Sequence, residues 1–385
     1  MEIAYYAPLK SPTHGTPSGD RRVARLLIDA LERAGHRVNL VSSFSGYDKS
    51  GDPGRQAALR EQGTELAQRL AAQWRDGTSG ARPDLWFTYH VFYKAPDWLG
   101  PFVSAALGIP YVLAEASYAS KRAGGPWAIG HEACGNAIRS ADLVICPSRD
   151  DIAGVRAQAG SPERILHLPP FLDPASFHAA RGAREAHRTR LAAEHDLDLR
   201  SPWILTVAMM RPGDKLASYR ALANALARVT DLEWQLIVAG DGAARAEVES
   251  AFADAVPGRT RFLGEMTLAD LASLNAASDL FAWPAVNEAY GMAMLEAQAA
   301  GLAVVSSNLR GVPDVVLDGR TGLLAAPGDE ASFAARLREL LTDRARREAM
   351  GIAAANFVDG ERGVALAAER LSDALTRVSN RAAPP

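Results

Sequence analysis

The sequence predicts an α/β fold with two doubly wound domains, each built on a parallel β-sheet with helices on both faces. Short apolar runs rich in β-branched residues alternate with helical patterns along nearly the whole chain, which is the order that parallel sheets require. The alternation is interrupted once, near the middle, and then starts again. A chain of 385 residues is also too long for one ordinary hydrophobic core.

Composition excludes several classes of protein. Hydrophobic residues make up 48% of the chain and the net charge is −3, which is typical of a globular protein without the basic field that nucleic-acid binding requires. Cys134 and Cys146 are too few for a disulfide or metal framework, so a reduced cytoplasmic setting is expected. No apolar run approaches the roughly 18 residues of a membrane helix. Composition does not exclude peripheral contact with a membrane.

The first domain is expected over residues 1–172. Residues 3–7 predict its first strand, and the following loop contains Gly15 and Gly19 before a helix begins. Glycines in such a loop let the backbone approach a ligand closely, although they could equally be ordinary turn residues. Gly15 and Gly19 are therefore candidates for a ligand-binding loop.

Two later strands of this domain end in polar residues. Residues 83–90 predict a buried strand that carries His90 at its C-terminal end, and a strand at 109–114 is followed by Glu115. In open α/β sheets the ligand crevice lies beyond these ends, which makes His90 a candidate site residue. The alternative is a structural histidine with satisfied ring nitrogens. His131 lies at the start of the next helix, just after a basic, glycine-rich loop.

Residues 173–200 are expected to connect the domains. This alanine-rich stretch carries charges of both signs. It predicts a linker with a polar helix that does not belong to a hydrophobic core. The second domain is then expected over residues 201–360, and a last helix over residues 361–380.

Two cations follow the first strand of the second domain. Arg211 and Lys215 lie on a strand-to-helix loop, at the C-terminal edge of the predicted sheet. Such a pair can clamp the phosphates of a ligand. The alternative is an ordinary solvated surface loop.

The segment 283–306 organises this domain and predicts a strand, a loop, a helix and a second strand. Glu288 comes just before the helix and Glu296 lies within it. A helix N-terminus beside Gly291 offers free N–H groups to a phosphate, and carboxylates accept hydrogen bonds from sugar hydroxyls. Helix capping alone would also explain the two glutamates, but the cations and glycine turns nearby favour a ligand.

The chain resembles glycosyltransferases of the GT-B fold, specifically the large retaining family 4 (glycosyl transferases group 1). The similarity covers nearly the whole chain and is closer in the second half. Its clearest motif pairs Glu288 with Glu296 across seven residues. Further similar stretches are 238–242, 256–279 with Gly264, 301–306 and 311–322.

The resemblance implies two Rossmann-like domains facing a central cleft, with a nucleotide-diphospho-sugar bound by the second. Glu296 would then hold the ribose hydroxyls, while Glu288 and the backbone near Tyr290 and Gly291 would hold the donor sugar and phosphates. Arg211 and Lys215 would neutralise the diphosphate. The remaining residues of the implied donor site are Gly264, beside the base, and Met292.

The chain departs from the family pattern in its first half. The family carries a histidine just after the strand at 109–114, where this sequence has Glu115. His90 and His131 are the nearby candidates to replace it. The candidate catalytic residues are therefore His90, Glu115 and Glu288, and the acceptor side is expected near Gly15, Gly19 and His131. The last helix is expected to return to the first domain.

The expected activity is transfer of a sugar from a nucleotide-diphospho-sugar to an acceptor hydroxyl. The acceptor would be a saccharide, a lipid-linked molecule or a small molecule, and no nucleic acid is expected as a partner. Metal-independent transfer without a further cofactor is expected, because fixed cations and a helix N-terminus can stabilise the leaving diphosphate. The site of action would be the cytoplasm or the inner face of the membrane. The alternatives are a nucleotide-sugar epimerase of the same fold and a non-catalytic nucleotide-sugar-binding protein.

Overall fold

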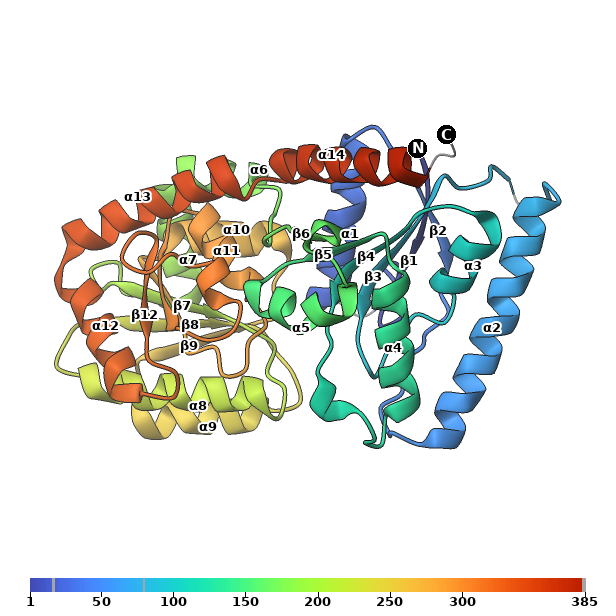
Figure 1. The fold of residues 1–385 in the computed structure, drawn as a ribbon. Helices are drawn as coiled ribbons and strands as arrows, with labels where there is room; N and C mark the ends of the chain where they lie inside the picture. Colours follow the sequence, from blue (N-terminus) through green and yellow to red (C-terminus); the bar gives the residue numbers. More distant parts are fainter. Residues whose placement is uncertain (16–17, 79, 383–385) are drawn as a thin grey trace. The chain divides into compact units, whose positions relative to one another are not determined.

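The computed structural model describes residues 1–15, 18–78 and 80–382, and the chain divides into two compact units. The first unit is Met1–Pro169 together with the chain from Val364 onward, and the second is Pro170–Gly363. Each unit contains one six-stranded sheet in which every pairing is parallel (Figure 1). The predicted α/β class with two Rossmann-like sheets is confirmed.

The first sheet has the strand order β2-β1-β3-β4-β5-β6. Its strands are β1 (Glu2–Tyr6), β2 (Arg37–Ser42), β3 (Leu85–Val91), β4 (Tyr111–Ala116), β5 (Leu143–Cys146) and β6 (Ile165–His167). The connecting helices are α1 (Gly19–Arg33), α2 (Pro53–Arg75), α3 (Gly100–Leu107), α4 (Ala128–Ser140) and α5 (Arg149–Ala159), with short 3₁₀ turns η1 (Ser120–Arg122) and η2 (Pro162–Arg164). Helix α1 covers one face, and α3 and α4 cover the other (Figure 1).

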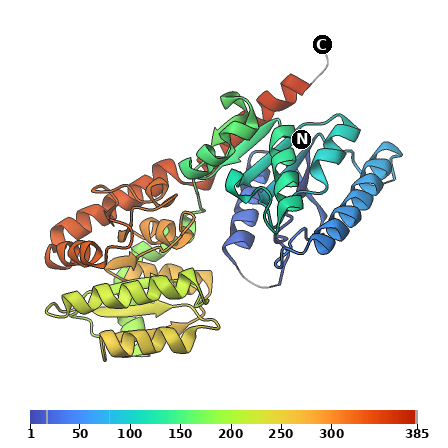
Figure 2. The same ribbon diagram turned by 60° about the horizontal axis from the view of Figure 1, so that its bottom comes forward.

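The second sheet has the order β12-β11-β10-β7-β8-β9. Its strands are β7 (Trp203–Val207), β8 (Gln235–Ala239), β9 (Thr260–Gly264), β10 (Leu280–Trp283), β11 (Ala303–Ser307) and β12 (Gly322–Ala325). The helices are α6 (Ala175–Gly182), α7 (Arg184–His195), α8 (Asp214–Leu226), α9 (Arg245–Ala255), α10 (Leu268–Ala277), α11 (Met292–Ala299), α12 (Glu330–Thr342) and α13 (Arg344–Glu361), with 3₁₀ turns η3 (Ala227–Val229) and η4 (Val312–Asp314). Helices α8 and α9 lie side by side on one face (Figure 2).

A buried carboxylate fixes the start of α3 against the first sheet. Asp97 is 3% exposed and accepts hydrogen bonds from the backbone N–H groups of Leu99 and Gly100, at 2.9 and 2.8 Å. It also accepts from the hydroxyls of Thr88 on β3 and Tyr111 on β4, at 2.6 and 2.7 Å. Burial nevertheless raises the pKa of Asp97. The four donors explain how a carboxyl group is accommodated among apolar side chains.

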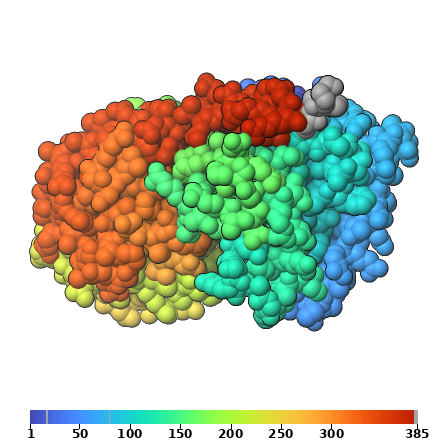
Figure 3. All heavy atoms as spheres, viewed as in Figure 1, coloured from blue at the N-terminus to red at the C-terminus, as the bar shows by residue number. Residues whose placement is uncertain are grey.

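The last helix, α14 (Val364–Ala382), belongs to the first unit and packs against α1. The space-filling view shows it (red) at the surface along the green part of this unit (Figure 3). Arg381 Nη2 lies 3.6 Å from Glu163 Oε2, and the guanidinium of Arg370 donates to the carbonyl of His167. Apolar residues on one side of α14, among them Leu371 and Leu375, are fully buried.

The stretch 173–200, expected to be a linker, is instead part of the second unit. It forms α6 and α7, and both helices pack against α10. Arg188 on α7 is 9% exposed, and its guanidinium carbon lies 4.1 Å from the centre of the Trp203 ring. The same guanidinium donates to Asp279 Oδ2 at 2.9 Å and to the carbonyls of Ala277 and Ser201. The charged stretch that predicted a linker thus includes a buried arginine whose two terminal nitrogens are both hydrogen-bonded.

Replacing Arg188 with alanine should destabilise the second unit. The change leaves two buried carbonyls without a donor and removes one of the two arginines that pair with Asp279, so we expect a loss of about 2–3 kcal/mol. A fall of roughly 5–10 °C in the thermal unfolding midpoint would report it.

The matched control is Arg190→Ala on the same helix. Arg190 pairs with Glu194 at the surface, with 45% and 46% of the two side chains exposed, so its loss should change stability by less than about 0.5 kcal/mol. Equal effects of the two substitutions would contradict a structural role for α7.

Candidate functional site

Parallel pairing brings the polar residues that follow the strands to one edge of each sheet. In the first unit, β3 and β4 are neighbours, and in the second, β7 and β10 are neighbours. Residues at the C-terminal ends of neighbouring strands therefore lie close together, which is where α/β folds bind ligands. Each unit places a group of candidate residues at this edge.

The first group is centred on His90. Its Nδ1 atom lies 3.1 Å from Asp20 Oδ1 and 3.8 Å from Glu115 Oε1. His90 and Glu115 occupy matching places on β3 and β4, because the register pairs Tyr89 with Ala114 and Val91 with Ala116. Both adopt left-handed backbone angles, with φ of +62° and +59°. Such angles cost about 1 kcal/mol or more for residues other than glycine, so two in neighbouring strands mark a functional edge.

Charge around His90 favours its protonated form. Burial alone would lower the pKa, but the carboxylates of Glu115 and Asp20, with a smaller effect from Asp151, raise the pKa of His90 to about 9. Burial would raise the pKa of Asp20, but its bond to His90 and the charge of Lys10 lower it. At neutral pH the group is therefore an imidazolium flanked by carboxylates.

Two arginines of α1 hold the loop that precedes this helix by hydrogen bonds to its carbonyl groups. Arg21 Nη1 donates to the carbonyls of His14 and Gly15, at 2.8 and 3.2 Å, and Arg25 Nε donates to the carbonyl of Pro12 at 2.9 Å. Arg21 and Arg25 thus hold this loop. Gly19 is the first residue of α1, whose first turn also carries Asp20. The loop thereby delivers Asp20 to His90.

His131, a candidate for the acceptor side, has a different environment. It is 5% exposed, its Nε2 atom lies 3.0 Å from the carbonyl oxygen of Ala119, and its ring lies 4.5 Å from the ring of Tyr118. These contacts anchor the loop that follows β4. The structure thus gives His131 a supporting role and does not place it in the group around His90.

The second group is centred on Glu288. Its Oε2 atom forms an ion pair with Lys215 Nζ and accepts a hydrogen bond of 3.2 Å from Trp283 Nε1. The Lys215 ammonium also lies 5.4 Å from the centre of the Trp283 ring. About 30% of the lysine side chain and 18% of the glutamate side chain are exposed. An ordered cation and an ordered carboxylate therefore share a site that solvent reaches.

The loop that carries Glu288 is held by hydrogen bonds from its neighbours. Ser218 Oγ accepts from Val286 N at 2.9 Å, and Asn287 Nδ2 donates to Asp214 Oδ2 at 2.7 Å. The carbonyl of Ala289 accepts from Gly311 N at 2.9 Å. Asn287 has φ of +53° and Ala285 of +59°. A strained loop that is fixed on both sides keeps the glutamate in place.

Helix α11 begins next to this loop. Gly291 is its N-cap with φ of +81°, and no described side chain caps the helix. Tyr290 is buried, and Met292 is the first helical residue. N–H groups at the start of the helix can therefore bind a ligand, although that of Met294 already donates to the carbonyl of Gly291, and the helix end carries a partial positive charge. Glu296 lies one turn further in and is only 3% exposed.

Glycines let two loops of the second sheet touch through their backbones. A methyl group on Gly240 would lie 2.0 Å from the carbonyl oxygen of Ala208, and one on Gly242 would lie 2.4 Å from that of Met210. Met210 is buried and its N–H bonds Asp241, so the next residue, Arg211, is directed to the surface, where it is exposed. Gly264 ends β9 with φ of +75°, and its carbonyl accepts from Gly240 N.

The structure thus joins some candidates and leaves others apart. His90 and Glu115 meet in the first unit, as do Lys215 and Glu288 in the second. Three residues were missed from the sequence: Asp20, Asp151 and Trp283. Asp20 directly follows Gly19 and starts a helix at the same sheet edge as His90, which could have revealed it. Trp283 ends β10, the strand next to β7, and its place beside Lys215 could be predicted only if the strand order were known.

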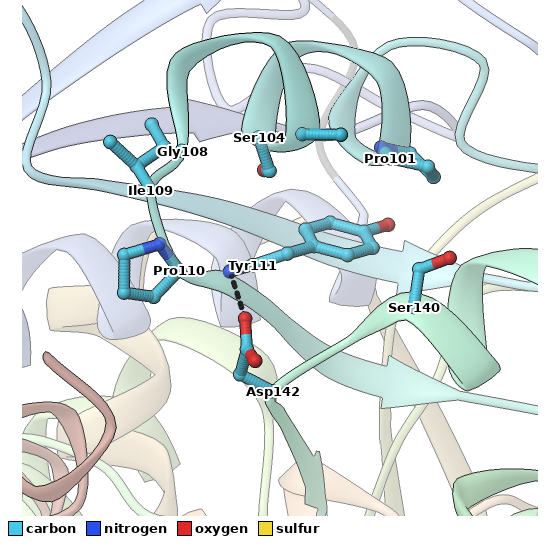
Figure 4. A pocket seen from close by; sticks show the side chains of 9 residues that line it. Pro101, Ser104, Gly108, Ile109, Pro110, Tyr111, Ser140 and Asp142 are labelled. Atoms are coloured by element: carbon cyan, nitrogen blue, oxygen red, sulfur yellow. Dashed lines mark hydrogen bonds between the residues drawn. The ribbon is translucent and has the colours of Figure 1, made fainter. Parts of the chain in front are cut away.

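A pocket of about 300 Å³ lies at the opposite edge of the first sheet. Figure 4 shows Ser104 and Tyr111 at its wall, and Tyr111 N–H donating to Asp142 Oδ2 at 2.9 Å. Tyr111 begins β4, whereas Glu115 lies near its end. The pocket is therefore at the N-terminal edge of the strands, away from the group around His90. Among the described helices, none combines the length and apolar character that crossing a bilayer requires.

Comparison with known proteins gives two family matches that together cover most of the chain. Residues 17–176 match the model of a family described as Glycosyltransferase Family 4. Residues 201–343 match the model of a family described as Glycosyl transferases group 1.

Curated relatives match over different lengths. A D-inositol 3-phosphate glycosyltransferase from Geodermatophilus obscurus is 30% identical over 98% of this chain and 90% of that protein. The alpha-maltose-1-phosphate synthase of Mycolicibacterium smegmatis is 28% identical over 69% and 71%. A D-inositol 3-phosphate glycosyltransferase from Corynebacterium diphtheriae is 35% identical, but over 36% of this chain and 34% of that protein. The match thus spans about a third of the length of this last relative.

Solved structures with the same fold cover nearly the whole chain. HepE from Anabaena in complex with UDP superposes with a TM-score of 0.74 at 17% identity, covering 98% of this chain and 100% of that one. Sucrose-phosphate synthase from Thermosynechococcus elongatus gives a TM-score of 0.72 at 20% identity, with 99% of both chains covered. At these identities the similarity shows a shared fold.

We predict that His90 titrates with a midpoint near pH 9. Its raised pKa contributes stability that is complete below the ordinary value of about 6.5 and is lost as pH rises through about 9. NMR titration of ¹³C-labelled histidine rings would give the midpoint directly. The substitution Asp20→Asn should move it to lower pH, because one neighbouring carboxylate is lost.

The control for this titration is Asp29→Asn, which removes a carboxylate of α1 that pairs with Arg33 at the surface. It should leave the midpoint of His90 unchanged. A wild-type midpoint at or below the ordinary value would rule out the charged arrangement described above.

Proposed function

The chain belongs to the family 4 glycosyltransferases (glycosyl transferases group 1), and from this premise we propose that it moves a sugar from a nucleotide-diphospho-sugar to a hydroxyl group of an acceptor. The observation that carries the proposal is the pairing of Lys215 with Glu288 beside the open N-terminus of α11. Membership in this family implies retention of configuration at the transferred sugar.

The leaving group of such a reaction is a nucleoside diphosphate, which gains negative charge as the glycosidic bond breaks. Lys215 and the first-turn N–H groups of α11 supply fixed positive charge for it. Glu288 holds the ammonium in place before the donor binds, and its carboxylate can also accept hydrogen bonds from sugar hydroxyls. Little reorganisation would then be needed when the donor arrives.

Other residues of the second unit complete the proposed donor site. The exposed Arg211 supplies a second cation for the diphosphate. Glu296, buried on α11, would accept the ribose hydroxyls, and the open backbone at Gly264 would lie beside the base. These three assignments come from the family resemblance and are proposals for this chain.

On the acceptor side, the charge state of His90 limits its role. An imidazolium donates hydrogen bonds but cannot take a proton, so His90 would orient a substrate oxygen and would not act as a general base at neutral pH. Glu115 and Asp20 are the hydrogen-bond acceptors of this group. They would receive hydroxyl groups of the acceptor.

We propose that transfer proceeds without a metal ion, because the cations and the helix N-terminus can stabilise the diphosphate. The sequence does contain an Asp-x-Asp pair, Asp196 and Asp198. It lies just before β7, at the opposite edge of the sheet from Lys215, and Asp198 accepts hydrogen bonds from Ser201 Oγ and Arg200 N. Asp196 and Asp198 are therefore not suited to bridge the proposed donor.

The proposed setting is the cytoplasm. Nucleotide sugars are available there, and its reducing conditions suit a protein with free thiols. Cys134 and Cys146 are both buried and unbonded to each other, and burial raises the pKa of each thiol to about 12. Thiols of this kind resist oxidation.

Donor binding should depend on Lys215. Screening nucleoside diphosphates and their sugars by thermal shift would identify the donor, and calorimetry would then compare variants. The substitution Lys215→Met removes the cation that would bind the phosphates of the donor, so we expect the affinity for the donor to fall about 10–100-fold. The matched control is Arg220→Met on the same helix, an exposed position that should bind normally.

Normal affinity of Lys215→Met would contradict the donor-site assignment. A donor that binds to the wild type but is never transferred or hydrolysed would instead favour a non-catalytic binding protein.

Transfer should also survive chelation. With the donor identified, initial rates in excess EDTA should match the rates without it, because the proposed charge stabilisation comes from side chains and backbone. Loss of the rate in EDTA and its return with added magnesium would refute the metal-independent proposal.

A further inference from the structure

Two cations and two aromatic rings form a second polar surface at the C-terminal edge of the first sheet. They are Tyr93 and Lys94, which follow β3, and Arg122 and Trp127, which follow β4. We call these four residues the aromatic–cation cluster. None of them serves the group around His90 directly, so the cluster requires its own explanation.

The rings hold the cations in place. The Tyr93 and Trp127 rings meet edge to face with their centres 5.6 Å apart. Lys94 Nζ lies 4.4 Å from the centre of the Trp127 ring and 5.8 Å from that of Tyr93, and the guanidinium carbon of Arg122 lies 5.0 Å from that of Tyr93. Both charged groups thus gather around the Tyr93 ring, by contacts that stabilise a cation.

The cluster is also fixed by the surrounding backbone. Trp127 Nε1 donates to the carbonyl of Asp48 at 3.0 Å, and the N–H of Asp48 donates to the carbonyl of Lys94 at 2.8 Å. Gln56 Nε2 donates to the carbonyl of Pro126 at 2.8 Å. These bonds join the loops that follow β2, β3 and β4, so the cations sit on a preformed surface and not on a free loop.

The charge of the cluster is not neutralised within the described part of the chain, where neither Lys94 nor Arg122 pairs with a carboxylate. Asp48, whose N–H bonds the carbonyl of Lys94, is an acidic residue next to the cluster and is 2% exposed. Its oxygens accept hydrogen bonds from Ser50 and Gly51, and Arg55 lies 3.6 Å away. Asp48 therefore already has its partners, and the two cations remain available to an anion from outside.

An aromatic side chain connects the cluster to the group around His90. The Phe92 ring lies 5.3 Å from the His90 ring and 5.6 Å from the Tyr93 ring. A molecule with one end at His90 would therefore have its other end near Tyr93 and the two cations.

From this arrangement we infer that the aromatic–cation cluster binds a phosphate group on the acceptor, the molecule whose hydroxyl receives the sugar. The inference rests on the proposed function and names its substrate class. Arg122 presents a fork of donors that matches two phosphate oxygens, and Lys94 adds a compact charge. The phosphate belongs either to a soluble sugar phosphate or to a lipid headgroup, and the same two side chains would bind both.

The test uses the whole protein labelled with 5-fluorotryptophan, in which the ¹⁹F resonance of Trp127 reports on the cluster. Glucose 6-phosphate is the soluble probe and glucose its uncharged control. Vesicles of phosphatidylcholine with phosphatidylglycerol, against phosphatidylcholine alone, form the lipid arm. We expect saturable binding of glucose 6-phosphate or of the anionic vesicles, with no response to glucose or to neutral vesicles.

Variants separate this site from the donor site. The double variant Lys94→Gln/Arg122→Gln should bind the responding probe at least tenfold more weakly. The charge-preserving Lys94→Arg/Arg122→Lys should retain most of the binding, and Arg69→Gln on the exposed side of α2 should bind like the wild type. Calorimetry with the donor nucleotide should give the same affinity for all of these proteins.

A response to glucose 6-phosphate alone would identify a soluble acceptor, and a response to anionic vesicles alone would identify a lipid phosphate. Absence of a saturable response in both arms, or an unchanged response in the double variant, would overturn the inference. Donor binding in the same samples shows separately whether the proposed function holds.

Discussion

Parallel pairing of the strands is the constraint on which both candidate sites depend. It collects the residues after β3 and β4 at one edge of the first sheet, and those after β7 and β10 at one edge of the second. His90 and Glu115 thereby come within 3.8 Å of each other although 24 positions separate them in the sequence. Lys215, in the first turn of α8, and Glu288, on the loop before α11, meet in the same way although they lie much further apart along the chain. The helices that follow the strands contribute side chains at these edges, such as Asp20 on α1 and Lys215 on α8.

The charged groups at the two edges fall into two kinds. Lys215 is paired with Glu288, and His90 is surrounded by carboxylates, so these cations are already oriented in the free protein. Lys94 and Arg122 are held by aromatic rings instead. A cation paired with a carboxylate can exchange or share that partner with a substrate, whereas one held by a ring keeps its attraction for an anion. This difference supports separate roles in positioning and in recognition.

The fold could be predicted from the sequence because the apolar runs and helical patterns alternate so regularly. The linker interpretation of residues 173–200 was wrong because composition cannot show that Arg188 is buried against Trp203. The pairing of Glu288 with Lys215 could have been predicted from the sequence, because both residues lie on predicted loops at the same edge of the sheet. Asp20 was missed because an acidic residue in a first helical turn is usually only a favourable charge at the helix end. Its contact with His90 depends on tertiary structure.

The central claim is that the second unit holds the donor between the loop after β7 and the N-terminus of α11. Hydrogen–deuterium exchange with and without a saturating nucleoside diphosphate tests it most directly. The account predicts slower exchange in peptides covering residues 208–216 and 286–296, because the bound diphosphate takes up N–H groups at the start of α11 and orders the first turn of α8, which carries Lys215. Binding without protection of either segment, or with protection confined to peptides of the first unit, would contradict it.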